Sequence, residues 1–274
     1  MSVRMPVVFV SHGAPDALLK APDAVDCWRE IGRHIPQPAA ILVVSAHWEA
    51  LQPTASLSGA PATIHDFSGF SPALERIQYP APGAPALAER VVALLSDADV
   101  AADRDPSRGL DHGAWVPLSA MVPQANVPVT QLSLVRHASA AAHFALGQAL
   151  APLREEGVLI LASGAITHNF GWLDWHADTE TIVPQARLFT DWVADRLAAQ
   201  DVPAMLDYRS APIGAAAHPT EEHFLPLFVA LGAAGGDTPQ RYQPRFAYGG
   251  LAMDAYLWRD RQGDPDGTAG TFPH

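Results

Sequence analysis

The chain has 274 residues, of which 49% are hydrophobic and 17% are charged, an ordinary composition for a globular protein. Its net charge of −12, from 17 basic and 29 acidic residues, argues against nucleic acid or an anionic membrane surface as a partner. No apolar run approaches the roughly 18 residues of a membrane span, and residues 1–6 lack the shape of a signal peptide. The one cysteine, Cys27, rules out an intrachain disulfide or a thiolate zinc cluster. We therefore expect a cytoplasmic protein whose metal, if it has one, is held by His, Asp or Glu.

Apolar runs typical of strands alternate with helical patterns along the chain. In chain order we predict a strand at 7–10, a helix at 23–35, a strand at 40–45, helices at 85–96 and 115–122, a strand at 127–134, a helix at 137–155, a strand at 158–162, helices at 181–199 and 220–231, and a late strand within 246–257. The helix at 220–231 is expected to have Thr220 as its N-cap, with Pro226 kinking it or delaying its start. The segment 51–83 is irregular, and a loop that long is usually functional.

This alternation predicts a single-domain α/β fold with a largely parallel central sheet and helices on both faces. We expect the catalytic domain to span residues 1–260. The segment 261–274, rich in Gly, Pro and Asp, is expected to be a flexible tail.

Three histidines lie just beyond predicted strands. His12 follows the first strand, His47 follows the second, and His168 follows the strand at 158–162. In an open α/β sheet, ligands bind in the crevice beyond the carboxyl ends of the strands. Because neutral imidazole is the commonest protein metal ligand, the pattern indicates a mononuclear metal enzyme.

His12 and His47 are the strongest ligand candidates, and a third ligand is needed. The run from His218 to His223 supplies it, at the start of a predicted helix. His223 is one choice. Glu222 is the other, because it would complete a triad of two histidines and one carboxylate.

Seven short motifs occur in an order and spacing that resemble one known family. The sequence is similar to the DODA-type extradiol aromatic ring-opening dioxygenases, the class III or LigB-type group, over about residues 6–257. The motifs are Ser11-His12-Gly13, Val44-Ser45-Ala46-His47-Trp48, Thr63-Ile64-His65-Asp66-Phe67, Tyr79-Pro80-Ala81-Pro82-Gly83, Asp111-His112-Gly113-Ala114-Trp115, Thr167-His168-Asn169 and the ten residues from His218 to Leu227.

The resemblance implies a non-haem Fe(II) enzyme that opens a catecholic ring beside its two hydroxyls with O2, giving a semialdehyde. It implies His12, His47 and His223 as metal ligands, with zinc able to occupy the site. It also implies His168 as the acid/base residue and His112 as a residue of the substrate pocket. We add His65, Trp48 and Trp115 as candidate substrate-binding residues. His65 lies in the long loop, where it either closes over a substrate or has a structural role in a turn. The two tryptophans adjoin motif histidines, where they either form pocket walls or pack in the core.

Two other functions are compatible with the same residues. Three histidines and an open coordination position also suit a zinc-dependent hydrolase, which would activate water instead of O2. A non-catalytic scaffold that binds a peptide in the same cleft would be marked by lost ligands, whereas every ligand position is filled here. A serine hydrolase is excluded by the lack of a G-x-S-x-G motif.

Overall fold

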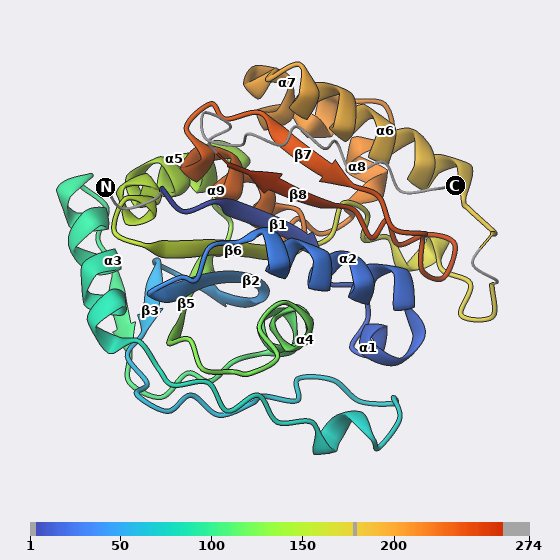
Figure 1. Ribbon diagram of the computed structural model, residues 1–274. Coiled ribbons are helices and arrows are strands. Elements are labelled where there is room, and N and C mark those ends of the chain that lie inside the picture. Colours follow the sequence, from blue (N-terminus) through green and yellow to red (C-terminus); the bar gives the residue numbers. More distant parts are fainter. Residues whose placement is uncertain (1–3, 178–179, 260–274) are drawn as a thin grey trace.

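A mixed, mostly parallel sheet of eight strands forms the centre of the computed structural model, which describes residues 4–177 and 180–259 (Figure 1). The strand order is β4-β3-β5-β2-β6-β1-β8-β7. The bounds are β1 (Val7–Ser11), β2 (Ala40–Ala50), β3 (Thr54–Ser56), β4 (Asp103–Asp105), β5 (Val129–Val135), β6 (Val158–Gly164), β7 (Pro239–Tyr242) and β8 (Ala255–Trp258). The four strands β5, β2, β6 and β1 are parallel neighbours, so their carboxyl ends meet at one edge of the sheet.

Helices cover both faces of this sheet, as the alternating pattern predicts. One core joins alternate residues of β1, such as Val7 and Phe9, to the helices α3, α5, α6 and α9. The other core joins Val8 and Val10 to α2 and α4. Because both faces are buried, β1 and β6 are apolar along almost their whole length. The helices are α1 (Ala17–Lys20), α2 (Pro22–His34), α3 (Pro85–Asp97), α4 (His112–Met121), α5 (Ala140–Leu150), α6 (Pro184–Ala198), α7 (Val202–Leu206), α8 (Gly214–Ala217) and α9 (Leu225–Ala234).

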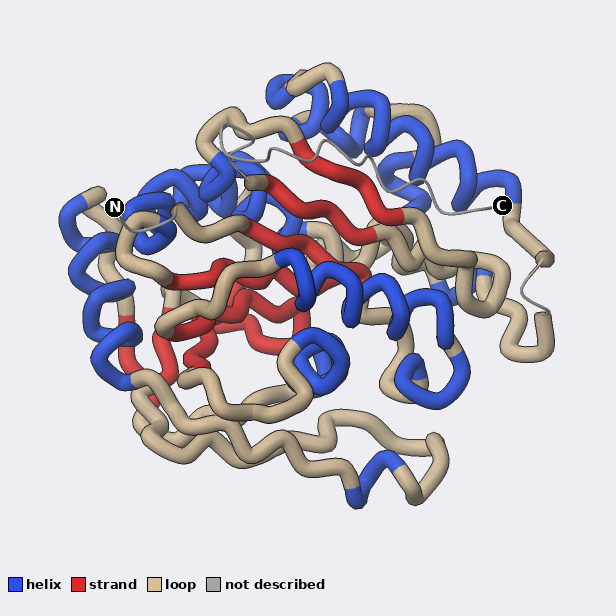
Figure 2. Tube along the Cα trace, viewed as in Figure 1, coloured by secondary structure: helices blue, strands red, loops and turns tan. Residues whose placement is uncertain are grey.

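The predicted loop 51–83 contains only short regular elements. Strand β3 and the single turn η1 (Leu74–Arg76) interrupt it, and the rest is irregular, as the long tan segment of Figure 2 shows. Its middle returns to the body of the protein, where the Ile64 backbone N–H donates to the Leu110 carbonyl at 2.7 Å. The loop therefore reaches the segment that precedes α4.

Four predicted boundaries differ from those of the structure. Strand β2 continues to Ala50, so His47 and Trp48 lie inside it, at an irregularity in its pairing with β5. Helix α4 starts at His112, three residues early, because the Asp111 carboxylate accepts a hydrogen bond from the Ala114 N–H.

Thr220 is not the N-cap of the helix predicted at 220–231. Helix α9 begins at Leu225, because Pro226 has no N–H and is tolerated only in the first turn. The delayed start leaves His223 in the turn before the helix. The predicted helix 137–155 is also shortened, to α5 followed by the short turn η2 (Ala151–Arg154).

Within residues 4–177 and 180–259, we find no helix with the length and apolar character needed to cross a membrane. The tail predicted at 261–274 lies outside the described residues.

Candidate metal centre

Three imidazoles converge at the carboxyl edge of the sheet. His12 follows β1, His47 lies near the end of β2, and His223 lies in the turn before α9. Each offers one nitrogen, and these nitrogens all lie within 4.8 Å of one another. His12 Nε2 and His47 Nε2 are 3.0 Å apart. Two nitrogens bound tetrahedrally to one ion at about 2.0–2.1 Å would be about 3.3 Å apart, so the spacing suits a shared ion.

The proton on His12 is located by its contact with strand β6. The Ser163 hydroxyl donates its one hydrogen to the Gly113 carbonyl oxygen and therefore accepts from His12 Nδ1 at 2.9 Å. His12 Nδ1 must then carry the proton, which leaves the Nε2 lone pair for a ligand. Ser163 can reach His12 because β6 lies between β1 and β2 in the sheet.

His223 is oriented by the residue before it. Its Nδ1 donates to Glu222 Oε1 at 2.8 Å, so Nε2 is again the free nitrogen. This is the carboxylate–histidine arrangement that supports many metal-binding histidines. The turn is held against β6 by a hydrogen bond from the Ala165 N–H to the His223 carbonyl at 2.8 Å. A Cβ at Gly164 would lie 2.1 Å from that same carbonyl oxygen, so this close approach requires glycine.

His47 and His112 share one carboxylate, that of Asp66 in the long loop. Asp66 Oδ1 accepts from the His112 backbone N–H at 3.0 Å and from His112 Nδ1 at 2.9 Å. Asp66 Oδ2 lies 3.6 Å from His47 Nδ1. The rings of His47 and His112 are 3.9 Å apart between centroids. Burial alone would raise the pKa of Asp66, but the hydrogen bonds from His112 outweigh it and lower that pKa to about 2.

His168 lies beside the three converging nitrogens. Its ring stacks on His223 with a centroid distance of 3.4 Å and an interplanar angle of 12°. Its Nδ1 is 3.9 Å from Glu222 Oε1, which is too long for a hydrogen bond. Among the described residues this buried nitrogen has no hydrogen-bond partner.

Burial keeps these imidazoles neutral. It lowers the pKa of His12 and of His223 well below the usual value, and the neighbouring histidines add to the effect. For His47, burial and then His112 lower the pKa to about 3, against the opposing effect of Asp66. Burial also lowers the pKa of His168, although Glu222 opposes the shift. Neutral imidazole is the form that binds a metal, so these histidines are already in the protonation state that metal binding requires.

The donor set fits a single divalent ion. Two further groups have the spacing of metal ligands, namely His47 with Asp66 and His112, and His168 with Glu222 and His223. In both, the carboxylate already accepts a hydrogen bond from a histidine of the same group, at 2.9 and 2.8 Å. The third group of the described part of the chain contains no carboxylate, and its three imidazole nitrogens face one another. It consists of His12, His47 and His223. Its residues would therefore hold the ion.

The three residues predicted to bind substrate make structural contacts of their own. His65 donates Nε2–H to the Ile77 carbonyl at 3.0 Å, and buried Trp115 donates to the Ile64 carbonyl at 3.0 Å. The Trp115 bond fastens the long loop to α4, whereas the His65 bond closes a contact within the loop itself. Trp48 is buried under the Arg108 guanidinium, 5.1 Å from its ring centroid. In the described part of the chain, the Trp48 ring packs against this cation and not against a ring of a site histidine.

Several supporting residues escaped the sequence analysis. Asp66 stands inside a motif that carries His65, and Ser163 directly follows the strand predicted at 158–162, but no spacing indicated which histidine each would contact. Asp111 is fully buried and accepts from Ser45 Oγ at 2.7 Å and from Arg108 at 2.9 Å. Arg108 in turn donates to the His47 carbonyl at 3.1 Å, so the ion pair of Arg108 and Asp111 helps to hold the His47 backbone in place.

Comparisons with known proteins show the family of this chain. Residues 5–255 match the model of the catalytic LigB subunit of aromatic ring-opening dioxygenase. The chain is 41% identical over 241 residues to a protein of Escherichia coli K12 named 4,5-DOPA dioxygenase extradiol, covering 87% of this chain and 88% of that one. It is 43% identical over 233 residues to the Beta vulgaris protein of the same name, covering 83% and 86%.

A crystal structure of an uncharacterized Escherichia coli K12 protein superposes with a TM-score of 0.77 at 35% identity, covering 93% of this chain and 100% of that one. The family match spans strands β1 to β7 and the segments that carry all five site histidines. The chain therefore belongs to the LigB family of class III extradiol ring-cleavage dioxygenases, oxidoreductases that act on an aromatic substrate and O2.

Proposed function

We propose that the chain is a non-haem Fe(II)-dependent extradiol dioxygenase that cleaves a catecholic ring beside its hydroxyls and releases a semialdehyde. One observation carries the proposal: three neutral imidazoles converge within 4.8 Å, and two further histidines, His112 and His168, stand beside them. His12, His47 and His223 would hold the ion. Bound Fe(II) would supply the redox chemistry toward O2 that Zn(II) lacks.

His168 is the residue to which we assign proton transfer. A catechol must lose protons to chelate a metal through both oxygens, and a base near the metal but not bound to it can accept one. His168 meets that description, because it stacks on His223 and its lowered pKa leaves it neutral and able to accept. Glu222, with Oε1 3.9 Å from His168 Nδ1, stabilises the cation that forms.

His112 is assigned to the substrate pocket. Its Nδ1–H donates to Asp66, which leaves Nε2 as the free nitrogen of a ring held in one orientation. Such a ring can hydrogen-bond a substrate oxygen and return a proton after ring opening. The catalytic unit we propose is the domain 1–260, and buried Cys27, the one cysteine, suits the reducing cytoplasm in which we place it.

Oxygen uptake with paired substrates tests this function. The protein is loaded with Fe(II) or Zn(II) without air and mixed with aerated DOPA, catechol or phenol, DOPA being included because relatives are named for it. We expect uptake and a yellow product with Fe(II) and a diol, and none with Zn(II) or with phenol, which cannot chelate. The His12→Ala variant is the control for metal loading.

Two outcomes would overturn the proposal. Hydrolysis without O2 by the Zn(II) protein would assign it to the hydrolase class. Absence of turnover with every diol, despite full Fe(II) content, would favour a binding role for the cleft.

A further inference from the structure

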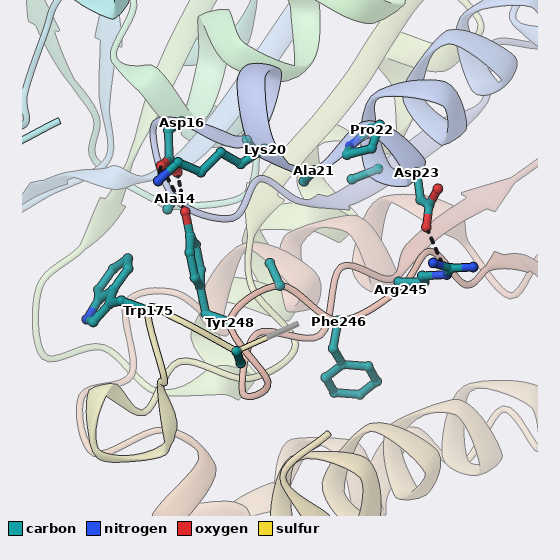
Figure 3. A pocket seen from close by; sticks show the side chains of 14 residues that line it. Ala14, Asp16, Lys20, Ala21, Pro22, Asp23, Trp175, Arg245, Phe246 and Tyr248 are labelled. Carbon is teal, nitrogen blue, oxygen red and sulfur yellow. Dashed lines mark hydrogen bonds and ion pairs between the residues drawn. The ribbon is translucent and has the colours of Figure 1, made fainter. Parts of the chain in front are cut away.

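A cavity of about 430 Å³ lies close to the candidate metal centre. We call it the Trp175 groove. Its walls come from the segment 14–24 on one side and from segments 175–177 and 245–248 on the other (Figure 3). Its volume falls in the range of about 300–1,000 Å³ that is usual for small-molecule sites.

Two independent links connect the groove to the histidines. Ala14 lines the groove and is two residues beyond His12, so the chain cannot separate them by more than about 7 Å between Cα atoms. The second link is a row of ring contacts. Phe67 lies 5.8 Å from His112, Phe70 lies 5.8 Å from Phe67, and Trp175 lies 6.5 Å from Phe70. A row of neighbouring aromatic rings thus leads from His112 to Trp175 in the wall of the groove.

The aromatic side of the groove is built and held in place. Trp175 and Tyr248 are 4.6 Å apart between ring centroids, and Trp175 is 47% exposed. The Tyr248 hydroxyl donates to the Asp16 carboxylate at 2.8 Å, which fixes the ring. Tyr248 has a φ of +53°, a left-handed conformation that a bulky residue rarely adopts. Such strain is found where a side chain must be held in a particular place.

Asp16 and Lys20 set the charge at one end of the groove, whereas Asp23 and Arg245 pair with each other at the other end. Asp16 is buried and already accepts from Tyr248 and from Lys20 Nζ at 3.0 Å, so it has little capacity for an ammonium ligand. The Lys20 side chain is 63% exposed. Its ammonium has three N–H donors, of which Asp16 accepts one. Figure 3 shows Lys20 and Tyr248 converging on Asp16 at one end of the groove, with Arg245 at the other.

We infer that the Trp175 groove binds the ring substituent of the diol substrate and favours an apolar stem that ends in a carboxylate. The stem would lie along Trp175 and Tyr248, and the carboxylate would accept from Lys20. This inference rests on the proposed function, because it assumes a diol ring held at the histidines.

Binding of two diols that differ only in the carboxylate tests the inference without turnover. The Zn(II)-loaded protein is titrated by calorimetry with 4-ethylcatechol and with dihydrocaffeate. For Lys20→Gln we expect the preference for dihydrocaffeate, as a ratio of dissociation constants, to fall about five-fold, the upper range for an exposed ion pair. For Trp175→Ala we expect both ligands to bind up to about ten-fold more weakly, as loss of an aromatic contact predicts.

Two matched controls separate these effects from general changes. Arg29→Gln removes an exposed cation of α2 whose partner is Asp26, and Leu19→Ala truncates an exposed residue beside Lys20. Neither residue lines the groove, and we expect wild-type dissociation constants for both. Trp175→Phe serves if Trp175→Ala does not fold, and it should retain most of the affinity.

An unchanged ratio in Lys20→Gln, whether both ligands keep their affinity or both lose it equally in that variant, would overturn the inference. If that result accompanies normal oxygen uptake with catechol, the groove assignment fails and the proposed function stands. A shifted ratio in a protein that cleaves no diol would refute the proposed function and leave the groove as a binding site.

Discussion

Glu222 provides the sharpest test of how the metal would be held, because it was a competing ligand on sequence grounds. In the structure its Oε1 accepts from His223 Nδ1 at 2.8 Å and from the Thr220 hydroxyl at 3.0 Å. It also lies 3.9 Å from His168 Nδ1. We therefore expect Glu222 to orient His223 without binding the ion itself.

The size of the effect follows from these contacts. Removing a carboxylate behind a metal-binding histidine typically weakens metal affinity about 10–100-fold, or about 1.4–2.7 kcal/mol. We expect Glu222→Ala to fall in that range, because the buried His223 N–H loses its acceptor. Glu222→Gln should lose about ten-fold or less, since an amide oxygen can still accept from Nδ1. His223→Ala should remove a ligand and bind far more weakly than either.

Competition with a chromophoric chelator measures the Zn(II) dissociation constant of each variant. Glu221→Gln is the matched control, because Glu221 contacts Arg209 and Tyr208 and not the site histidines. If Glu222→Ala lost as much affinity as His223→Ala, Glu222 would be a ligand and the triad would contain a carboxylate. An unchanged dissociation constant would mean that the hydrogen bond to His223 has no orienting role.

Three further substitutions test other parts of the structure. Asp66→Asn should keep its metal but lose about 10–100-fold in turnover, because His112 loses its charged partner; unchanged oxygen uptake would refute this role. Gly164→Ala should weaken metal binding, since its Cβ would lie 2.1 Å from the His223 carbonyl oxygen, and a wild-type chelator titration would contradict the packing argument. Arg154→Leu should lower the free energy of unfolding by about 3–5 kcal/mol, because fully buried Arg154 donates to three backbone carbonyls and to Asp237. Urea unfolding measures this change, and a loss below about 1 kcal/mol would show that the acceptors find other donors.

Local pattern was sufficient for the fold class and for the identity of the histidines. The runs at 7–10, 40–45 and 158–162 form strands that helices cover on both faces. Parallel strands covered in this way are nearly continuous hydrophobic runs, so the sequence predicts them. Because parallel strands end at one edge, the placement of His12 and His47 beyond or near those ends was enough to predict that they meet. The family resemblance then singled out His223, which the residues alone left in competition with Glu222.

Tertiary structure decided which side chain serves which histidine. Glu222 and His223 are adjacent in sequence, and only the turn created by the late start of α9 makes one the partner of the other. Asp66 reaches His112 across 46 residues, and Ser163 reaches His12 across 151. The Trp175 groove likewise joins three distant segments. A hydrogen bond or a cavity requires two segments to be positioned to within a few tenths of an ångström. The separation of those segments along the chain carries no such information, so these contacts form only when the sheet and its loops are assembled.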